Sequence, residues 1–199
     1  MSINPKTYLL LRTHNRPIEF NNCINSISKQ SVLPEIIIIS DDNNDTYIND
    51  VRIPHQIFHP KRIKRRRWIR NHNPYNDYFN QVLSIIPDNN YVIYLDDDDI
   101  LLNKDWIKII LEKKTDLLIG KFKMGKNHNY KLIGNKIKRG EIGTSCFAIR
   151  SEISKIYKWP KKRGGDYLFI KQIAADYNPK FIDIIIGGVQ KNLNKSWKN

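Results

Sequence analysis

Short apolar runs alternate with amphipathic segments along the first half of the chain. Thr7 to Leu11 and Ile36 to Ile39 are almost wholly apolar, which is typical of strands covered on both faces. Between them, Asn15-Arg16-Pro17 predicts the capped start of a helix that continues to about Gln30, because proline is favoured in a first helical turn. Similar patterns predict strands at 56–58, 91–95, 116–122, 145–149 and 181–186, and helices at about 75–86, 106–113, 151–157 and 166–177.

This alternation predicts a mostly parallel central sheet flanked by helices. A chain of 199 residues with 40% hydrophobic content can bury one substantial core, so we expect a single α/β domain over 1–199. A stretch rich in Gly, Asn and Lys at 125–140 predicts a hairpin or a mobile loop. In such sheets ligands bind beyond the carboxyl ends of the strands, where the polar clusters 12–16, 41–42 and 96–99 all fall.

Four consecutive aspartates, Asp96 to Asp99, follow the predicted strand at 91–95. Carboxylates that close together repel one another unless a positive charge joins them. Mg²⁺ or Mn²⁺ would relieve the repulsion and keep open positions for the oxygens of a diphosphate. The alternative is a solvated acidic turn that caps the next helix. The apolar strand before the run favours a metal-assisted nucleotide site.

The other two clusters are weaker signals when each is taken alone. The segment Arg12 to Pro17 offers main-chain donors and the imidazole of His14, but it could equally be a helix cap with a surface arginine. Asp41 and Asp42 could accept the imide N–H of uracil, although aspartates are common in turns. Their convergence on one edge of the sheet favours a binding role for both.

These motifs resemble those of the family 2 inverting glycosyltransferases, which have the GT-A fold. The resemblance covers about Thr7 to Tyr177. The matching segments are Thr13-His-Asn-Arg-Pro17, Ile39-Ser-Asp-Asp-Asn-Asn-Asp-Thr46, Leu95-Asp-Asp-Asp-Asp99 and Gly165-Asp-Tyr-Leu-Phe169. The resemblance implies one GT-A-like domain with a donor-binding half at about 1–100 and an acceptor half at about 101–190.

The resemblance also implies a function: inverting transfer of a sugar from a nucleotide-sugar, with a UDP-sugar favoured, to a hydroxyl acceptor. The acceptor would be a glycan or another hydroxyl compound, anionic ones included, and the cofactor Mn²⁺ or Mg²⁺. By the same resemblance, Asp41 would bind the base, Asp96 or Asp97 the ribose and phosphate region, Asp98 the metal, and Asp166 would deprotonate the acceptor. The remaining residues expected at the donor are Arg12, Thr13, His14, Arg16, Asp42 and Arg70.

Several positions depart from the family pattern or leave alternatives open. His14 replaces the usual tyrosine, and Gly165 stands where many members have glutamate. The family's Arg-Asn pair matches Arg70-Asn71 by residue type or Asn80 by spacing. Asp166 lies at the start of a predicted helix, so it could instead be a helix cap.

Net charge widens the range of partners. Lys and Arg total 34 against 20 Asp and Glu, and this charge of +14 favours polyanions. The basic run Lys61 to Arg70 could clamp a diphosphate or an anionic acceptor, bind nucleic acid, or be a solvated loop; its place between two donor-side clusters favours the clamp. A nucleotidyltransferase and a non-enzymatic nucleic-acid-binding module are therefore the alternative functions. The aspartates would repel nucleic acid without a cation, so we expect no such partner.

The remaining features of the sequence concern the location of the protein, its two cysteines and nucleotide-binding motifs that are absent. No apolar stretch approaches the ~20 residues of a membrane span, and the first residues do not resemble a signal peptide, so we expect a cytoplasmic protein. Cys23 and Cys146 are far apart in the sequence, which favours buried thiols over a disulfide or a zinc site. Neither a P-loop nor a dinucleotide-binding glycine motif is present.

Overall fold

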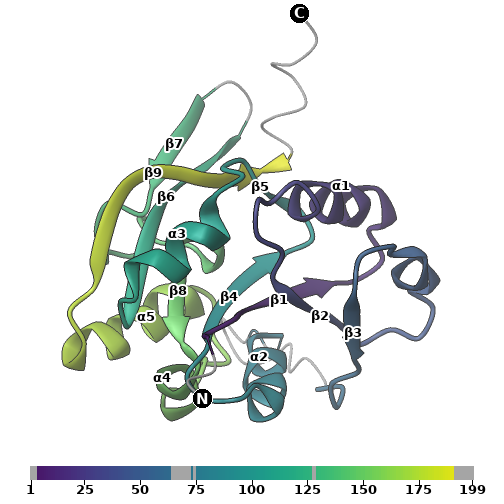
Figure 1. Cartoon of the computed structure of the whole chain (residues 1–199). Helices are drawn as coiled ribbons and strands as arrows, with labels where there is room; N and C mark the ends of the chain where they lie inside the picture. The colour runs from purple at the N-terminus through teal and green to yellow at the C-terminus, as the bar shows by residue number, and fades with distance from the viewer. Residues whose placement is uncertain (1–3, 64–72, 74, 127–128, 191–199) are drawn as a thin grey trace, which may run out of the picture.

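The computed structural model describes residues 4–63, 73, 75–126 and 129–190 (Figure 1). Its strands are β1 (Thr7–Thr13), β2 (Glu35–Ser40), β3 (His55–Phe58), β4 (Tyr91–Asp96), β5 (Asp99–Leu101), β6 (Leu117–Lys126), β7 (Asn129–Ile133), β8 (Phe147–Arg150) and β9 (Lys180–Val189). Its helices are α1 (Pro17–Ile27), α2 (Asn76–Val82), α3 (Trp106–Lys113), α4 (Ser151–Ile156) and α5 (Gly165–Asp176).

One curled sheet runs through the domain in the order β3-β2-β1-β4-β8-β6-β9-β5, and β7 pairs with β6. The first four strands are parallel, which confirms the predicted α/β class. Beyond β4 the directions are mixed, since β8 is antiparallel to both its neighbours whereas β6 and β9 are parallel. The parallel register places Arg12 of β1 beside Asp96 of β4 and beside Ile39 of β2, so the ends of these strands meet at one edge.

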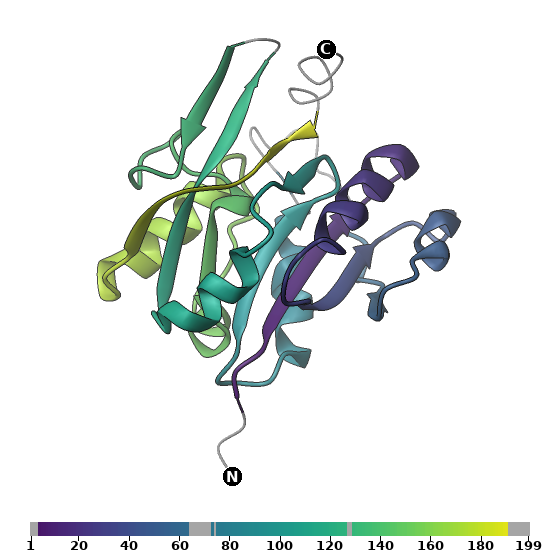
Figure 2. The same cartoon turned by 45° about the horizontal axis from the view of Figure 1, so that its top comes forward.

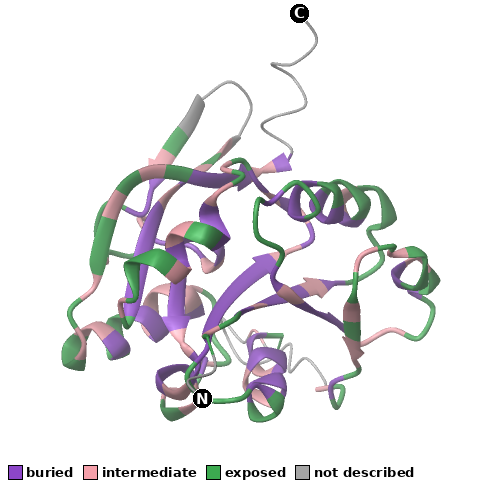
Figure 3. Ribbon diagram, viewed as in Figure 1, coloured by how far each residue is buried: buried purple, intermediate pink, exposed green. Residues whose placement is uncertain are grey.

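Helices cover both faces of the sheet (Figures 1 and 2). Helices α1 and α3 lie on one face, while α2, α4 and α5 lie on the other. Strands β1 and β4 are buried between these layers (Figure 3). On the second face, an aromatic cluster with ring centroids 4.4 to 6.2 Å apart joins α2, β4, β8 and α5; its members are Phe79, Tyr94, Phe147, Trp159 and Phe169. The cluster fixes α5, and therefore the first turn of that helix, against the sheet.

The start of α1 differs from the prediction. The N-cap is Arg16, and no side chain caps this helix, whereas the sequence predicted a capped start. Asn15 has a φ of 49°, and its N–H donates to Oδ1 of Asp45 at 2.9 Å. Oδ2 of the same buried Asp45 accepts from Ser40 at the end of β2. The predicted cap was wrong because a carboxylate distant in the sequence holds the turn.

Other elements keep their predicted places but change in length. The helix predicted at 75–86 ends at Val82 and continues as a 3₁₀ turn, Leu83–Ile85. The strand predicted at 145–149 begins only at Phe147, because Thr144–Cys146 form another 3₁₀ turn. Strand β5 was not predicted. The stretch at 125–140 contributes to the β6–β7 hairpin, which projects beyond the rest of the sheet (Figure 2).

Cys23 and Cys146 are buried and form no disulfide, as expected. None of the helices in the described part of the chain combines the length and the apolar character needed to cross a membrane.

Candidate active site

The three polar clusters predicted to converge do so at the carboxyl ends of β1, β2 and β4. They border a cavity of ≈ 380 Å³, which we call the first cavity. Among the residues that line it, those predicted from the sequence as site residues are Arg12, Thr13, His14, Arg16, Asp41, Asp96, Asp97 and Asp98. Asn73, Tyr75 and Tyr78 also line it and were not predicted as site residues. A tyrosine on the apolar face of a helix was a usable signal, because a buried hydroxyl needs a hydrogen-bond partner.

Arginines neutralise the first part of the aspartate run. Oδ1 of Asp96 accepts a hydrogen bond from Nε of Arg12 and lies 2.7 Å from Nη2 of the same guanidinium. This guanidinium also lies over the ring of Phe79. Nη1 of Arg16 lies 3.0 Å from Oδ1 of Asp97 and 3.2 Å from Oδ2 of Asp98. The repulsion that we expected a cation to relieve is therefore balanced in part by side chains of β1 and of the turn after it.

Asp97 and Asp99 are also held by hydrogen bonds from other parts of the fold. Asp97 is 4% exposed and accepts from the hydroxyl of Thr13 and the main-chain N–H of His14. Asp99 accepts from the hydroxyl of Ser145 at 2.5 Å. Burial raises the pKa of Asp97 and raises that of Asp99 much further, since the neighbouring carboxylates add to it. These bonds fix the two side chains at the edge of the sheet, although Asp97 still lines the first cavity and Asp99 lines the second; Asp96 and Asp98 line both.

The chemistry of Asp98 fits a divalent cation that is shared with a substrate. Within the described ranges, no three His, Cys, Asp or Glu side chains are grouped so that they alone could hold a metal ion. The side chain of Asp98 is 28% exposed and offers hard carboxylate oxygens to the first cavity. Magnesium in nucleotide enzymes is commonly held by one or two carboxylates together with substrate phosphates. These carboxylate oxygens fit a cation whose coordination is completed by substrate phosphates. They do not form a metal site made of protein ligands alone.

Asp41 lines the first cavity from the end of β2. Its side chain is 6% exposed, accepts a 2.6 Å hydrogen bond from the hydroxyl of Tyr78, and lies 3.3 Å from Nδ1 of His14. Burial, together with this hydrogen bond, raises the pKa of Tyr78. Asp42 does not line either cavity: its Oδ1 accepts from the N–H of Asn44, so its observed role is to shape the turn after β2.

A second cavity of ≈ 260 Å³ also borders the aspartate run. Asp96 and Asp98 line both cavities. Carboxylates and hydroxyls supply the polar part of the second cavity, and Phe122, Met124 and Val189 supply an apolar part. Asp166 also lines the second cavity, so the predicted base and the predicted metal ligand face the same space.

Asp166 belongs to the first turn of α5 but does not cap it. The N-cap is Gly164, with a φ of 75°, and no side chain caps the helix. Oδ1 of Asp166 accepts from the adjacent N–H of Tyr167 at 2.8 Å. Burial raises the pKa of Asp166, and the charge of Asp96 acts in the same direction, while Arg12 and the N–H of Tyr167 lower it. A higher pKa makes the ionised carboxylate a better proton acceptor.

The glycine before Asp166 is required by close packing. A Cβ at Gly165 would lie 2.1 Å from Nδ2 of Asn76 and 3.0 Å from the carbonyl oxygen of Pro160. Asn76 is 5% exposed, and its Nδ2 donates to the carbonyls of Pro160 and Lys162. No larger side chain fits this position without breaking those bonds, which is why glycine and not glutamate stands here.

Gly165→Ala should therefore lower the free energy of unfolding by about 1–3 kcal/mol, because displacing Asn76 leaves two carbonyls without their donor. Urea unfolding measures this loss. In an Asn76→Ala background, the same substitution should cost clearly less, since the clashing amide is gone. Equal costs in the two backgrounds would show that Asn76 is not the reason for the glycine.

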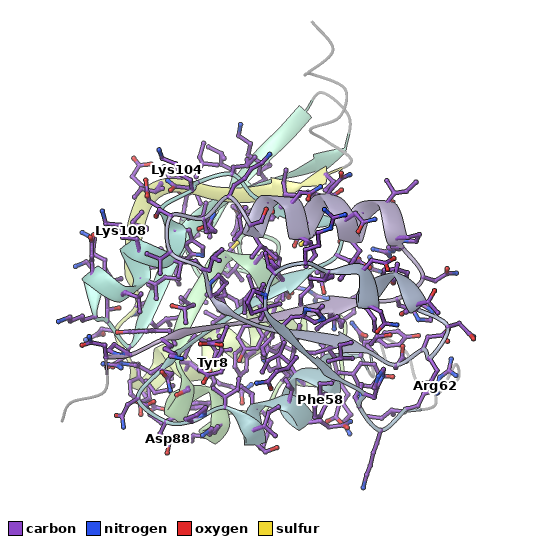
Figure 4. All side chains as sticks on the ribbon, turned by 45° about the vertical axis from the view of Figure 1, so that its right-hand side comes forward. Tyr8, Phe58, Arg62, Asp88, Lys104 and Lys108 are labelled. Carbon is purple, nitrogen blue, oxygen red and sulfur yellow. The ribbon has the colours of Figure 1, made fainter. Side chains whose placement is uncertain are left out.

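Of the two candidates for the predicted Arg-Asn position, Asn80 lies among the described residues. Asn80 donates to the carbonyl of Trp159 and accepts from its N–H, so it supports the loop before α5 and lines neither cavity. Arg70 and Asn71 lie outside the described residues, as does most of the basic run. Within the described start of that run, Arg62 is exposed at the outer edge of the molecule (Figure 4), with Nε 3.9 Å from Oδ2 of Asp41.

No protein-family model matches the sequence, and no curated protein matches it. Among solved structures, the chain is similar to S. aureus TarS 1–349 (TM-score 0.68, 18% identity, 92% of this chain and 60% of that one). It is also similar to the mannosyltransferase PcManGT from Pyrobaculum calidifontis in complex with GDP-Man and Mn²⁺ (0.63, 12%, 94% and 57%). A third similar structure is glucosyl-3-phosphoglycerate synthase from Mycobacterium tuberculosis with Mn²⁺, UDP-glucose and phosphoglyceric acid (0.61, 12%, 93% and 72%).

At sequence identities this low, the similarity to these solved structures establishes the fold alone. The fold is a GT-A-like α/β domain, as the resemblance implied. The chain spans less than two thirds of the length of TarS 1–349 and of the mannosyltransferase.

Proposed function

We propose that this protein transfers a sugar from a nucleoside diphosphate-sugar to a hydroxyl acceptor, with inversion at the anomeric carbon and dependence on Mn²⁺ or Mg²⁺. A UDP-sugar is the favoured donor. The observation that carries the proposal is the pair of cavities that share Asp96 and Asp98, with Asp166 facing the second. Such an arrangement supports donor and acceptor sites that meet at the reacting bond.

The donor is assigned to the first cavity. Asp41 would accept a hydrogen bond from the base, and Asp96 would contact the ribose and phosphate region, since Asp97 already has three internal partners. Asp98 would hold the divalent cation, which when bound supplies positive charge against the diphosphate of the leaving group. Thr13, His14 and the two arginines of this region complete the donor side.

The acceptor is assigned to the second cavity. Asp166 takes the proton of the acceptor hydroxyl as that oxygen bonds to the anomeric carbon. The bond from this carbon to the diphosphate oxygen breaks, and its electron pair leaves with the nucleoside diphosphate. Attack and departure on opposite faces of the sugar invert the anomeric centre. Four aspartates line the second cavity, so an uncharged hydroxyl fits it better than an anionic group.

A thermal-shift series tests the donor site without knowledge of the acceptor. UDP, GDP and their sugar conjugates are added with Mn²⁺ or with a chelator. A diphosphate present at 100 times its Kd stabilises the native state by about 2.7 kcal/mol. In a domain of this size, that raises Tm by about 5–10 °C. We expect the rise with Mn²⁺ and its loss with chelator; no rise with any nucleotide would contradict the proposal.

A further inference from the structure

The end of β9 is joined to the turn that carries two of the four aspartates. Asp97 and Asp98 form the turn between β4 and β5, and Gln190 directly follows β9. Val189 pairs with Asp99, so the end of β9 lies beside β5 and close to α1 (Figure 1). Gln190 is 3% exposed and lines neither cavity. Any effect of this residue on a ligand must therefore act through its neighbours.

Gln190 holds both peptide groups that flank the Cα atom of Asp98. Its Nε2 donates to the carbonyl oxygen of Asp97 at 2.8 Å, and its main-chain N–H donates to the carbonyl oxygen of Asp98 at 2.8 Å. The first carbonyl belongs to the peptide before Asp98 and the second to the peptide after it. Because peptide groups are planar, holding both fixes φ and ψ of Asp98. The direction in which the Asp98 side chain leaves the main chain is then fixed as well.

The side-chain amide of Gln190 is held in turn by α1. Nε2 also donates to the carbonyl oxygen of Glu19 at 2.7 Å, and Oε1 accepts from Nδ2 of Asn22 at 3.2 Å. Both N–H donors of the amide and its oxygen are thus engaged, and leaving them unpaired in a buried place would be costly. The amide therefore has one favourable orientation, which ties the turn to the helix.

Asp98 depends on its main chain more than Asp97 does. The side chain of Asp97 accepts from three groups of β1 and of the turn after it. The described partner of the Asp98 side chain is Arg16, with Nη1 3.2 Å from Oδ2. Resting on the proposed function, we propose that Gln190 is a positioning residue that aims the Asp98 carboxylate at the divalent cation without touching the cation or the nucleotide.

Gln190→Met tests this proposal, because methionine is of similar length and flexibility but has no N–H donor. Calorimetry measures the Kd of UDP with Mn²⁺ and with a chelator, and the ratio of the two values is the gain from Mn²⁺. We expect this gain to fall about tenfold or more, as it does for other residues that orient metal ligands. The affinity measured with chelator should stay close to that of wild type, since the cation is then absent.

Gln30→Met is the matched control. Gln30 is also a buried glutamine; its Nε2 donates to the carbonyl oxygen of Asn103 at 2.8 Å, and its Oε1 accepts from the N–H of Ile107 at 3.4 Å. It lines neither cavity. This variant should lower Tm as Gln190→Met does, yet keep the wild-type gain from Mn²⁺. An equal loss of that gain in both variants would mean that general weakening of the fold is the cause, and the proposal would be wrong.

Asn22→Ala keeps the proposal testable if Gln190→Met does not fold. Asn22 is exposed on α1, and alanine is a good helix former, so the fold should tolerate the change. Oε1 of Gln190 loses its donor, and the amide is then held less firmly. We expect the gain from Mn²⁺ to fall by about threefold, the effect of one neutral hydrogen bond. A wild-type gain in this variant would overturn the proposal.

The failures of the two proposals are distinguishable. If wild type gains affinity for UDP from Mn²⁺ and folded Gln190→Met gains equally, the donor site stands and Gln190 has only a structural role. If wild type gains nothing from Mn²⁺, the proposed metal-dependent donor site is itself wrong, and the inference falls with it.

Discussion

Asp166→Asn should lower turnover by about 10²- to 10⁴-fold while Tm and the affinity for the donor stay close to those of wild type. An amide cannot take the proton that a sugar hydroxyl must lose. The substitution is nearly isosteric, and its side-chain oxygen can still accept from the N–H of Tyr167. Steady-state kinetics with saturating donor measure the loss, and calorimetry measures donor affinity in the same variant.

The structure removes the alternative role of Asp166 as a helix cap. A helix cap would also tolerate asparagine, but the N-cap of α5 is Gly164, so capping does not explain Asp166. Glu152→Gln is the matched control, because Glu152 occupies the first turn of α4 and lines neither cavity. It should leave turnover unchanged. Near-normal turnover in Asp166→Asn would remove this residue from the mechanism.

Asp98→Asn should abolish the part of donor binding that depends on Mn²⁺. A neutral amide is a far poorer ligand for a hard cation than a carboxylate, and Asp98 is the least engaged aspartate that faces both cavities. Its described partner is Arg16, whose guanidinium keeps Asp97 when Asp98 is neutralised. The fold should therefore survive. Calorimetry of UDP binding with Mn²⁺ and with chelator measures the difference.

Asp88→Asn provides the comparison for Asp98. Asp88 also pairs with a basic side chain, that of Lys155, but it is exposed and lies away from Arg62 (Figure 4). Its substitution removes the same charge and should leave Mn²⁺-dependent binding unchanged. If Asp98→Asn binds UDP with the wild-type response to Mn²⁺, the cation is held elsewhere or is not needed.

The sheet and the meeting of the polar clusters could be predicted because they follow from local patterns. Apolar runs at Thr7 to Leu11 and Ile36 to Ile39 leave few alternatives to buried parallel strands. Once strands are parallel, their carboxyl ends share an edge, and residues after them converge. The same reasoning placed Asp41 and Asp96 on one cavity without knowledge of any contact.

Features that depend on distant parts of the chain could not be predicted. The Arg12–Asp96 pair follows from the register between β1 and β4, and the bond from Ser145 to Asp99 joins a turn to a strand of three residues. No periodicity reveals so short a strand. The partner of the Tyr78 hydroxyl could not be named from the sequence, because Asp41 lies in another cluster. Asp42, which was expected at the donor, makes local hydrogen bonds in the turn after β2 and lines neither cavity.

The products formed from a nucleotide-sugar test the central proposal most directly. The protein is incubated with UDP-glucose, Mg²⁺, pyrophosphate and a mixture of simple sugars, and the phosphorus resonances are followed by NMR. Glycosyl transfer predicts UDP as the new nucleotide, whether a sugar or water accepts the glucose. Nucleotidyl transfer would instead consume pyrophosphate and yield UTP with glucose 1-phosphate, and that result would contradict the proposed function.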